Sequence, residues 1–291
     1  MKTTGKLLLL LVLLASCSCA TNERVILLKG VQNARELGGL VMKDGRSIVH
    51  GKLVRSGDLS EATDKDVAIL KDRFHLTDVF DFRVDTDLEE EPDRVIDGVR
   101  YTHLSTLPPA YVDGFSSGST DTTEVESDNP LEALTRYAFD PGVQQMVKDI
   151  YPAILTDSLS RKRYGEFLKG VLNAEGGVLW HCSQGKDRAG WGTAFVLAAL
   201  GASRETIVED FDLSNKPYAK YVKYLSSHVR KMGGGEAEVA FIRATVGASV
   251  EYFERALDLI DTQYGSLSAY LEEALGLTAQ EQQLLRDKYL K

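Results

Sequence analysis

The stretch from Val178 to Gly190 constrains this chain more than any other, because it predicts a strand, a tight loop and a helix in succession. Residues 178–180 are a short apolar run of the β-forming type, and Gly185 relaxes the backbone of the loop that follows. Residues 191–200 are apolar and favour a helix. The sequence therefore predicts an α/β protein in which this loop joins the end of a strand to the start of a helix.

The same loop carries Cys182 and, six positions later, Arg188. A short loop that enters a helix N-terminus points backbone N–H groups inward and forms a concave site for an oxyanion. These amides, the helix dipole and the basic side chains of Lys186 and Arg188 would hold the cysteine as a thiolate. The planar guanidinium of Arg188 can bind two phosphate oxygens. The pattern predicts a nucleophile with a phosphate clamp; the alternative is a buried, inert cysteine behind a strand.

The run His181-Cys182, five residues and Arg188 resembles the signature of the cysteine-dependent protein tyrosine and dual-specificity phosphatases. With Lys186-Asp187-Arg188 inside the loop, it is most similar to a bacterial branch of atypical tyrosine and phosphoinositide phosphatases. The resemblance covers most of residues 31–289. It implies a central, mostly parallel sheet flanked by helices, with a helical lid insertion and a helical C-terminal part.

This resemblance also implies roles for individual residues. Cys182 would attack phosphorus, Asp187 would be the first candidate for the general acid, and His181 would orient the loop. Phosphate would be bound by the loop residues Ser183, Gln184, Gly185, Lys186, Asp187 and Arg188. No metal and no cofactor are expected. The charge of Lys186 would favour multiply phosphorylated ligands, or would only support the thiolate.

Upstream motifs of the same branch are weaker signals. Asp81-Phe82-Arg83 ends a predicted strand over 76–82 and corresponds to an Asp-Leu-Arg element, so Asp81 is the second candidate for the acid or an orienter of Arg188. The alternative is a salt bridge within the scaffold. The segments 33–39 and 55–57 resemble Asn-x-Arg-Asp-Leu-Gly-Gly and Arg-Ser-Gly elements, and each alone indicates a structural role. The acidic run 85–93 is typical of a solvated face.

The N-terminal residues predict export. Lys2 and Lys6 precede the apolar run 7–14, and Leu14-Ala15-Ser16-Cys17 resembles a bacterial lipoprotein cleavage box. We expect a signal peptide over 1–16, a tether over 17–30 that carries a lipid on Cys17, and one phosphatase domain over 31–291. Such a protein would be membrane-anchored on the periplasmic or cell-surface side; the alternative is a secreted protein. Residues 105–156 could form a lid insertion or a surface loop without a role.

Composition limits the partners. The chain has 291 residues and a formal net charge of −9, with no basic stripe interleaved with aromatic residues, so nucleic acid is excluded as a partner. Of its three cysteines only Cys182 lies outside the N-terminal segment, so a disulfide framework is excluded there. The expected substrates are phosphate monoesters: phosphotyrosine or phosphoserine/threonine in proteins, or phosphoinositides.

Other functions stay open at this stage. An inositol polyphosphate phosphatase and a non-catalytic receptor for a phosphorylated ligand would both use a phosphate nest. A rhodanese-type sulfurtransferase also uses a loop cysteine, but its loop is one residue shorter. Ala189 stands where the commonest phosphatase pattern has Ser or Thr, whose hydroxyl bonds the cysteine sulfur. Slow breakdown of a cysteinyl-phosphate is therefore expected.

Overall fold

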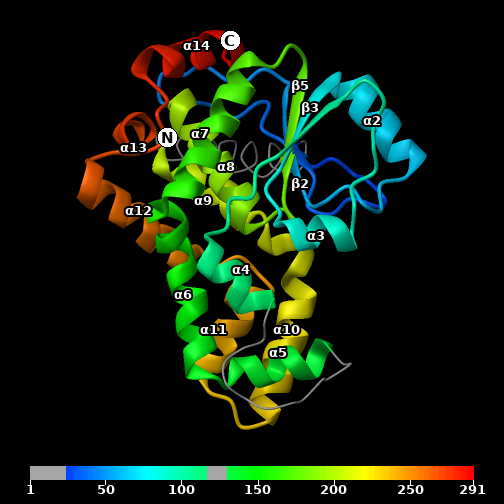
Figure 1. The fold of residues 1–291 in the computed structure, drawn as a ribbon, viewed down its shortest axis with the longest axis vertical. Helices are drawn as coiled ribbons and strands as arrows, with labels where there is room; N and C mark the ends of the chain where they lie inside the picture. Colours follow the sequence, from blue (N-terminus) through cyan, green and yellow to red (C-terminus); the bar gives the residue numbers. More distant parts are fainter. Residues whose placement is uncertain (1–23, 117–129) are drawn as a thin grey trace, which may run out of the picture.

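A central sheet organises the computed structural model, which describes residues 24–116 and 130–291 (Figure 1). The strand order is β1-β2-β5-β3-β4, with β1 antiparallel to β2 and all other neighbours parallel. The strands are β1 (Arg35–Glu36), β2 (Leu53–Ser56), β3 (Leu76–Asp81), β4 (Arg100–His103) and β5 (Gly177–His181). The predicted α/β fold with a mostly parallel sheet is confirmed.

Strand β5 lies in the middle of the sheet and every one of its residues is buried. Its side chains alternate between two cores, as the two-residue period of a strand requires. Val178 and Trp180 belong to the large core, whereas Leu179 belongs to a smaller one. A strand covered on both faces is apolar throughout rather than alternating, which explains why the run 178–180 predicted it.

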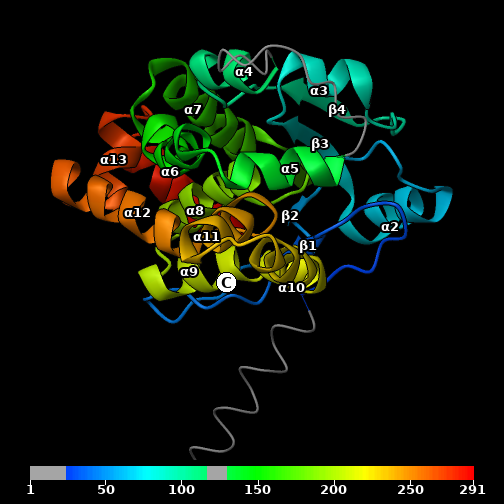
Figure 2. The ribbon, with the colours of Figure 1, turned by 90° about the horizontal axis from the view of Figure 1, so that it is seen from below.

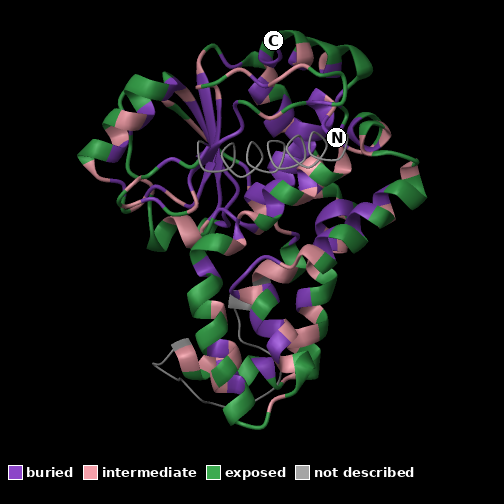
Figure 3. Cartoon of the chain, turned by 180° about the vertical axis from the view of Figure 1, so that it is seen from behind, coloured by how far each residue is buried: buried purple, intermediate pink, exposed green. Residues whose placement is uncertain are grey.

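Helices cover both faces of the sheet (Figure 1). The smaller core packs under α2 (Asp64–Phe74), which begins at a capping box of Thr63 and Asp66. The larger core is built with α7 (Ser158–Asn173), α8 (Asp187–Leu200), α9 (Arg204–Asp212) and α14 (Ala279–Tyr289). Helix α8 ends at Gly201, which adopts the left-handed conformation that favours glycine. In Figure 3 the strands are buried and the outer helix faces exposed.

A helical lobe extends beyond the carboxyl ends of the strands (Figures 1 and 2). It contains α4 (Pro109–Ser116), α5 (Pro130–Ala138), α6 (Pro141–Thr156), α10 (Asn215–Lys231) and α11 (Glu236–Thr245). The first three belong to the insertion predicted over 105–156, of which residues 117–129 lie outside the described part. Short α3 (Asp85–Glu90) follows β3, and α12 (Val250–Tyr264) and α13 (Leu267–Glu273) complete the C-terminal part.

The domain packs against part of the segment that was predicted as a tether. Arg24 is buried and pairs with Asp210 at 2.9 Å, and Val25 bridges to Arg35, so the last residues of the expected tether 17–30 pack on the domain. The predicted signal peptide over 1–16 and the predicted lipidation site Cys17 lie outside the described residues. Within the described ranges no helix is long and apolar enough to cross a membrane.

Candidate active site

Residues 182–186 form the loop between β5 and α8, at the carboxyl edge of the sheet. Trp180 fixes this junction, because its indole Nε1 donates to the Ala189 carbonyl at 3.2 Å and to Thr193 Oγ1 at 3.0 Å. The strand end and the first turn of the helix are therefore tied together directly beneath the loop. This is the strand–loop–helix arrangement that the sequence predicted.

Side chains from other parts of the chain donate hydrogen bonds to the carbonyl groups of the loop. Asn33 Nδ2 donates to the Gly185 carbonyl at 2.9 Å, and Tyr218 donates its hydroxyl to the Gln184 carbonyl at 3.1 Å. Arg55 Nη2 donates to the carbonyls of Gly185 and Lys186 at 2.7 and 3.0 Å. Because these contacts direct the carbonyls outward, the amides of the loop face the other way.

The loop amides themselves are left for a ligand. In the described part of the chain no hydrogen bond is donated by the backbone N–H groups of residues 183–188. Gly185 allows the tight turn with φ of 66°, and a Cβ at this position would lie 2.3 Å from the Ser56 carbonyl oxygen. Only glycine fits that position. The result is a nest of amides at a helix N-terminus, which is a site for a tetrahedral oxyanion.

Arg55 is itself fixed by a buried cluster of charges. Its Nη1 lies 2.9 Å from Asp210 Oδ2, and Arg24 and Arg35 pair with the same carboxylate. Burial alone would raise the pKa of Asp210, but Arg35, Arg55 and Arg24 outweigh it and hold that pKa far below its usual range. The motifs around Asn33 and Arg55, expected to be structural, therefore support the phosphate loop through its carbonyls.

Cys182 and Arg188 are brought together as predicted. Cys182 is 3% exposed, and the Arg188 side chain is 17% exposed, with Nη2 donating to Ser183 Oγ at 3.0 Å. Burial acts to lower the pKa of Arg188, but the neighbouring Cys182 and Asp87 outweigh it and raise that pKa. A cation that stays charged beside a sulfur nucleophile is the arrangement that stabilises a thiolate.

Asp87 is the carboxylate beside Arg188. Its Oδ2 lies 3.3 Å from Arg188 Nη1 and accepts a hydrogen bond from Ser183 Oγ at 3.1 Å. Asp87 belongs to α3, in the acidic run 85–93 that was expected to be a solvated face. That expectation is wrong for Asp87, because the chain turns back over the loop after β3 and brings α3 to its rim.

Asp187 is the first residue of α8 and lies at the mouth of the site. Its side chain is 32% exposed, and Oδ1 accepts a hydrogen bond from the hydroxyl of Tyr151 on α6. Burial, followed by the charge of Asp187, raises the pKa of Tyr151 well above its ordinary value, so this phenol remains a donor. Tyr151 was not anticipated, since nothing in the sequence places it opposite the loop.

Lys186 is turned away from the nest. Its Nζ donates to the carbonyls of Thr245, Val246 and Gly247, at 2.7, 3.1 and 2.7 Å. An ammonium group has three N–H donors, and here all three are used at the C-terminal end of α11. Burial lowers the pKa of Lys186. The expectation that its charge would serve a multiply phosphorylated ligand is therefore not supported by this arrangement.

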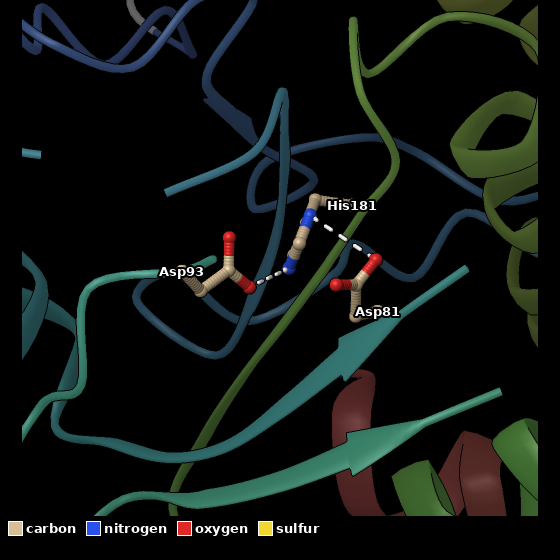
Figure 4. Close-up of side chains that lie close together, drawn as sticks. All are labelled: Asp81, Asp93 and His181. Carbon is tan, nitrogen blue, oxygen red and sulfur yellow. Dashed lines mark ion pairs between the residues drawn. The ribbon is translucent and has the colours of Figure 1, made fainter. Parts of the chain in front are cut away.

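His181 lies behind the nucleophile between two carboxylates (Figure 4). Its Nε2 is 2.9 Å from Asp93 Oδ2 and its Nδ1 is 3.7 Å from Asp81 Oδ1. Burial acts to lower the pKa of His181, but the two carboxylates outweigh it and raise that pKa. The two carboxylates therefore favour the protonated form of the histidine that precedes the cysteine.

Asp81 belongs to a buried cluster, called the cage, that also contains His181, Asp93 and Arg83. It is not part of the nest of loop amides. Its carboxylate binds Arg83 Nη2 at 2.8 Å, and the same nitrogen reaches Asp93 Oδ1 at 2.9 Å. The structure thus favours the scaffold salt bridge over Asp81 as an orienter of Arg188. Asp81, Asp93 and His181 have the spacing of a metal site, with ligand atoms within 4.8 Å. Arg83 already supplies the positive charge there.

A cavity of about 680 Å³ opens from the nest. Its polar lining includes Asp87, Glu90, Asp187 and Arg188, whereas much of its wall is apolar, with Leu107, Val112, Val147, Ile150 and Ile154. The walls come from α3, α4, α6 and α11, so the predicted insertion does border the site. Whether it moves as a lid stays a prediction.

The nest, the buried cysteine and the arginine fork together define a cysteine-dependent phosphatase site: a nucleophile under a cradle for one phosphoryl group. Comparison with known proteins agrees. The model of the tyrosine phosphatase family matches residues 26–291. The chain belongs to this family and is a phosphoric monoester hydrolase of the protein-tyrosine-phosphatase type.

Relatives of the chain bear phosphatase names. It is 28% identical to a candidate tyrosine-protein phosphatase of Cupriavidus necator over 263 residues, which cover 89% of this chain and 86% of that protein. It is 29% identical to the triple specificity protein phosphatase PtpB of Mycobacterium tuberculosis over 239 residues, covering 77% and 86%. The core catalytic domain of the PP-IP phosphatase SIW14 from S. cerevisiae is 12% identical with a TM-score of 0.30, covering 82% of this chain and 97% of that chain. A TM-score this low adds nothing to the assignment.

Proposed function

We propose that this phosphatase acts on single phosphate monoesters carried by an aromatic or apolar body, with phosphotyrosine in proteins as the first candidate. The observation that carries the proposal is the lining of the cavity: beyond Arg188 its wall is largely apolar, and Asp87, Glu90 and Asp187 add negative charge. Arg188 is the one cation among the described lining residues. Further phosphates on an inositol ring would face carboxylates, which disfavours inositol polyphosphates.

In the proposed reaction the Cys182 thiolate attacks phosphorus while Arg188 and the loop amides bind the equatorial oxygens. The bond from phosphorus to the leaving oxygen breaks, and that oxygen takes a proton from Asp187. Water then attacks the cysteinyl-phosphate, releasing phosphate and restoring the thiolate as Asp187 regains the proton. The position of Asp187 at the mouth of the cavity supports this role. The hydrogen bond from the Tyr151 hydroxyl fixes the Asp187 carboxyl group in place.

A phosphate-release panel tests the substrate class. We expect kcat/KM to be highest for phosphotyrosine peptides, lower for phosphoserine peptides and phosphoinositide vesicles, and lowest for inositol polyphosphates. Ile150 is half-buried in the apolar wall. Ile150→Lys should raise relative activity toward inositol polyphosphates, whereas Ile150→Met should not. Highest activity of the parent on inositol polyphosphates would overturn the assignment.

The role of Asp187 as the general acid is tested by comparing two substrates whose leaving oxygens differ in basicity. Replacing a general acid costs about 10²- to 10⁴-fold, and the loss grows as the leaving oxygen becomes more basic. Asp187→Asn should therefore slow phosphotyrosine hydrolysis much more than p-nitrophenyl phosphate hydrolysis, whereas Asp81→Asn should slow both equally. An equal loss on both substrates for Asp187→Asn would remove Asp187 from this role.

We also propose that the chain is exported and anchored through a lipid on Cys17, on the periplasmic or cell-surface side. The support is the sequence of residues 1–20 alone. Metabolic labelling with a radioactive fatty acid should mark the parent and not Cys17→Ser, which should leave the membrane fraction. Cleavage after residue 19 or 20 without label would show a secreted protein instead.

A further inference from the structure

Helix α10 concentrates positive charge in an acidic protein. Within Asn215–Lys231 there are five lysine and arginine residues and no aspartate or glutamate, although the chain has a formal net charge of −9. Lys216, Lys220, Lys223 and Lys231 are exposed, and in the described ranges none of these four forms an ion pair. Their spacing of three, four and eight residues puts them on one face of the helix.

Aromatic residues border this face. Tyr221 and Tyr224 are 49% and 56% exposed, and their rings stack on each other with centroids 6.4 Å apart. Met232, directly after the helix, is 56% exposed. The opposite side of α10 is buried through Tyr218, Leu225 and Val229, which anchors the helix on the domain. Tyrosine has an apolar ring and a polar tip, and is favoured where water meets lipid.

A hollow lies beside the same helix, between α10, α11 and the start of α12. Its volume is about 710 Å³, within the range of ligand sites. Its cations are Lys223, Arg230 and Arg243, and its hydroxyl groups include Ser227 and Ser249. Arg230 pairs with Glu236 at 2.6 Å, and the one carboxylate among the described lining residues, Glu251, is neutralised by Arg255 at 2.7 Å. Apolar wall is supplied by Ala219, Val222, Ala240 and Val250. Cations around an apolar hollow match a ligand with an anionic head and an apolar body.

We propose that the exposed face of α10 and this hollow dock on an anionic lipid surface, with a phospholipid headgroup entering the hollow. A basic helix face flanked by aromatic side chains is the pattern of proteins that lie on acidic membranes. An acidic protein partner would match the lysines but would not account for the apolar hollow. On its buried side the same helix contacts the phosphate loop, because Tyr218 donates to the Gln184 carbonyl at 3.1 Å.

Vesicle binding by the full chain tests this proposal. We compare phosphatidylcholine vesicles with vesicles in which phosphatidylglycerol replaces part of the phosphatidylcholine, at low and high salt. The variant combines Lys220→Gln, Lys223→Gln and Lys231→Gln. The control makes the same charge change at exposed lysines on other elements, Lys43→Gln, Lys65→Gln and Lys169→Gln. All proteins share one N-terminal segment, so its contribution to binding is equal.

The parent should prefer anionic vesicles, and salt should weaken that preference. Each lysine near an anionic surface contributes about fivefold to binding, the equivalent of about 1 kcal/mol. The α10 variant should therefore lose roughly 100-fold of the preference and the control much less, with unchanged thermal unfolding in both. Equal binding of the parent to both vesicles, or equal losses in the two variants, would overturn the proposal. So would binding of polyglutamate without binding of vesicles.

Discussion

Arg55 gives the sharpest test of how the phosphate loop is built. Its side chain is fully buried, with Nη1 at 2.9 Å from Asp210 Oδ2 and Nη2 on the carbonyls of Gly185 and Lys186. Arg55→Met keeps much of the volume and removes the charge and the donors. The buried charge and the loop support are thereby lost together.

The expected loss of stability follows from the buried pair. Breaking a buried ion pair costs about 3–5 kcal/mol, and the lower end applies because Arg24 and Arg35 still pair with Asp210. A loss of about 3 kcal/mol lowers the Tm of a protein of this size by roughly 6–12 °C. Differential scanning calorimetry measures this. Arg255→Met is the matched control, because its pair with Glu251 is exposed on both sides and contributes about 1 kcal/mol or less.

The loop effect should appear in kinetics. Two hydrogen bonds to the loop, at about 1 kcal/mol each, correspond to roughly a 30-fold fall in kcat/KM. Asn33→Ala removes another donor to the Gly185 carbonyl, so the double variant should show non-additive losses. Unchanged kcat/KM in folded Arg55→Met, measured well below its Tm, would refute the role of these outward contacts.

Two further outcomes follow from the site. The raised pKa of His181 means that its contribution to stability is complete below the unfolded value of about 6.5 and is lost as pH rises through the folded value. Asp93→Asn should shift that alkaline fall in Tm to lower pH, and an unchanged pH profile of Tm would contradict the cage. Ala189 predicts a burst of product followed by a slow steady rate. Ala189→Thr should raise the steady rate about fivefold, for one added hydrogen bond, while Ala189→Val should not; equal rates would contradict the missing-hydroxyl argument.

The catalytic loop could be predicted because its signals are local. Strand, loop and helix follow one another between 178 and 200, and a residue such as Gly185 reports the turn directly. The parts that hold the loop are remote. Arg55 reaches it because β2 pairs with β5 in a register that sets Arg55 opposite Trp180, and no pattern near Arg55 reveals that pairing.

Lys186 shows why charge alone misleads. Its position in the loop suggested a phosphate ligand, but its partners are carbonyls at the end of α11, about sixty residues later in the chain. The acidic run after β3 led to the opposite error, because it was expected to be a solvated face without a role in the site. Asp87 pairs with Arg188, and Asp93 pairs with His181. Both pairs form because a short helix after the strand folds back over the site. The partners of these charged residues are set by the tertiary fold, which the local sequence does not reveal.

The central claim is that Cys182 is the nucleophile of a phosphate nest. Its most direct test is mass spectrometry of an acid-quenched reaction, combined with turnover and phosphate binding by Cys182→Ser. The account predicts a phosphate adduct on Cys182 in the parent, and a serine variant that binds phosphate without turnover. A serine variant with parental turnover, or a parent that binds phosphate and hydrolyses none of the panel, would contradict it.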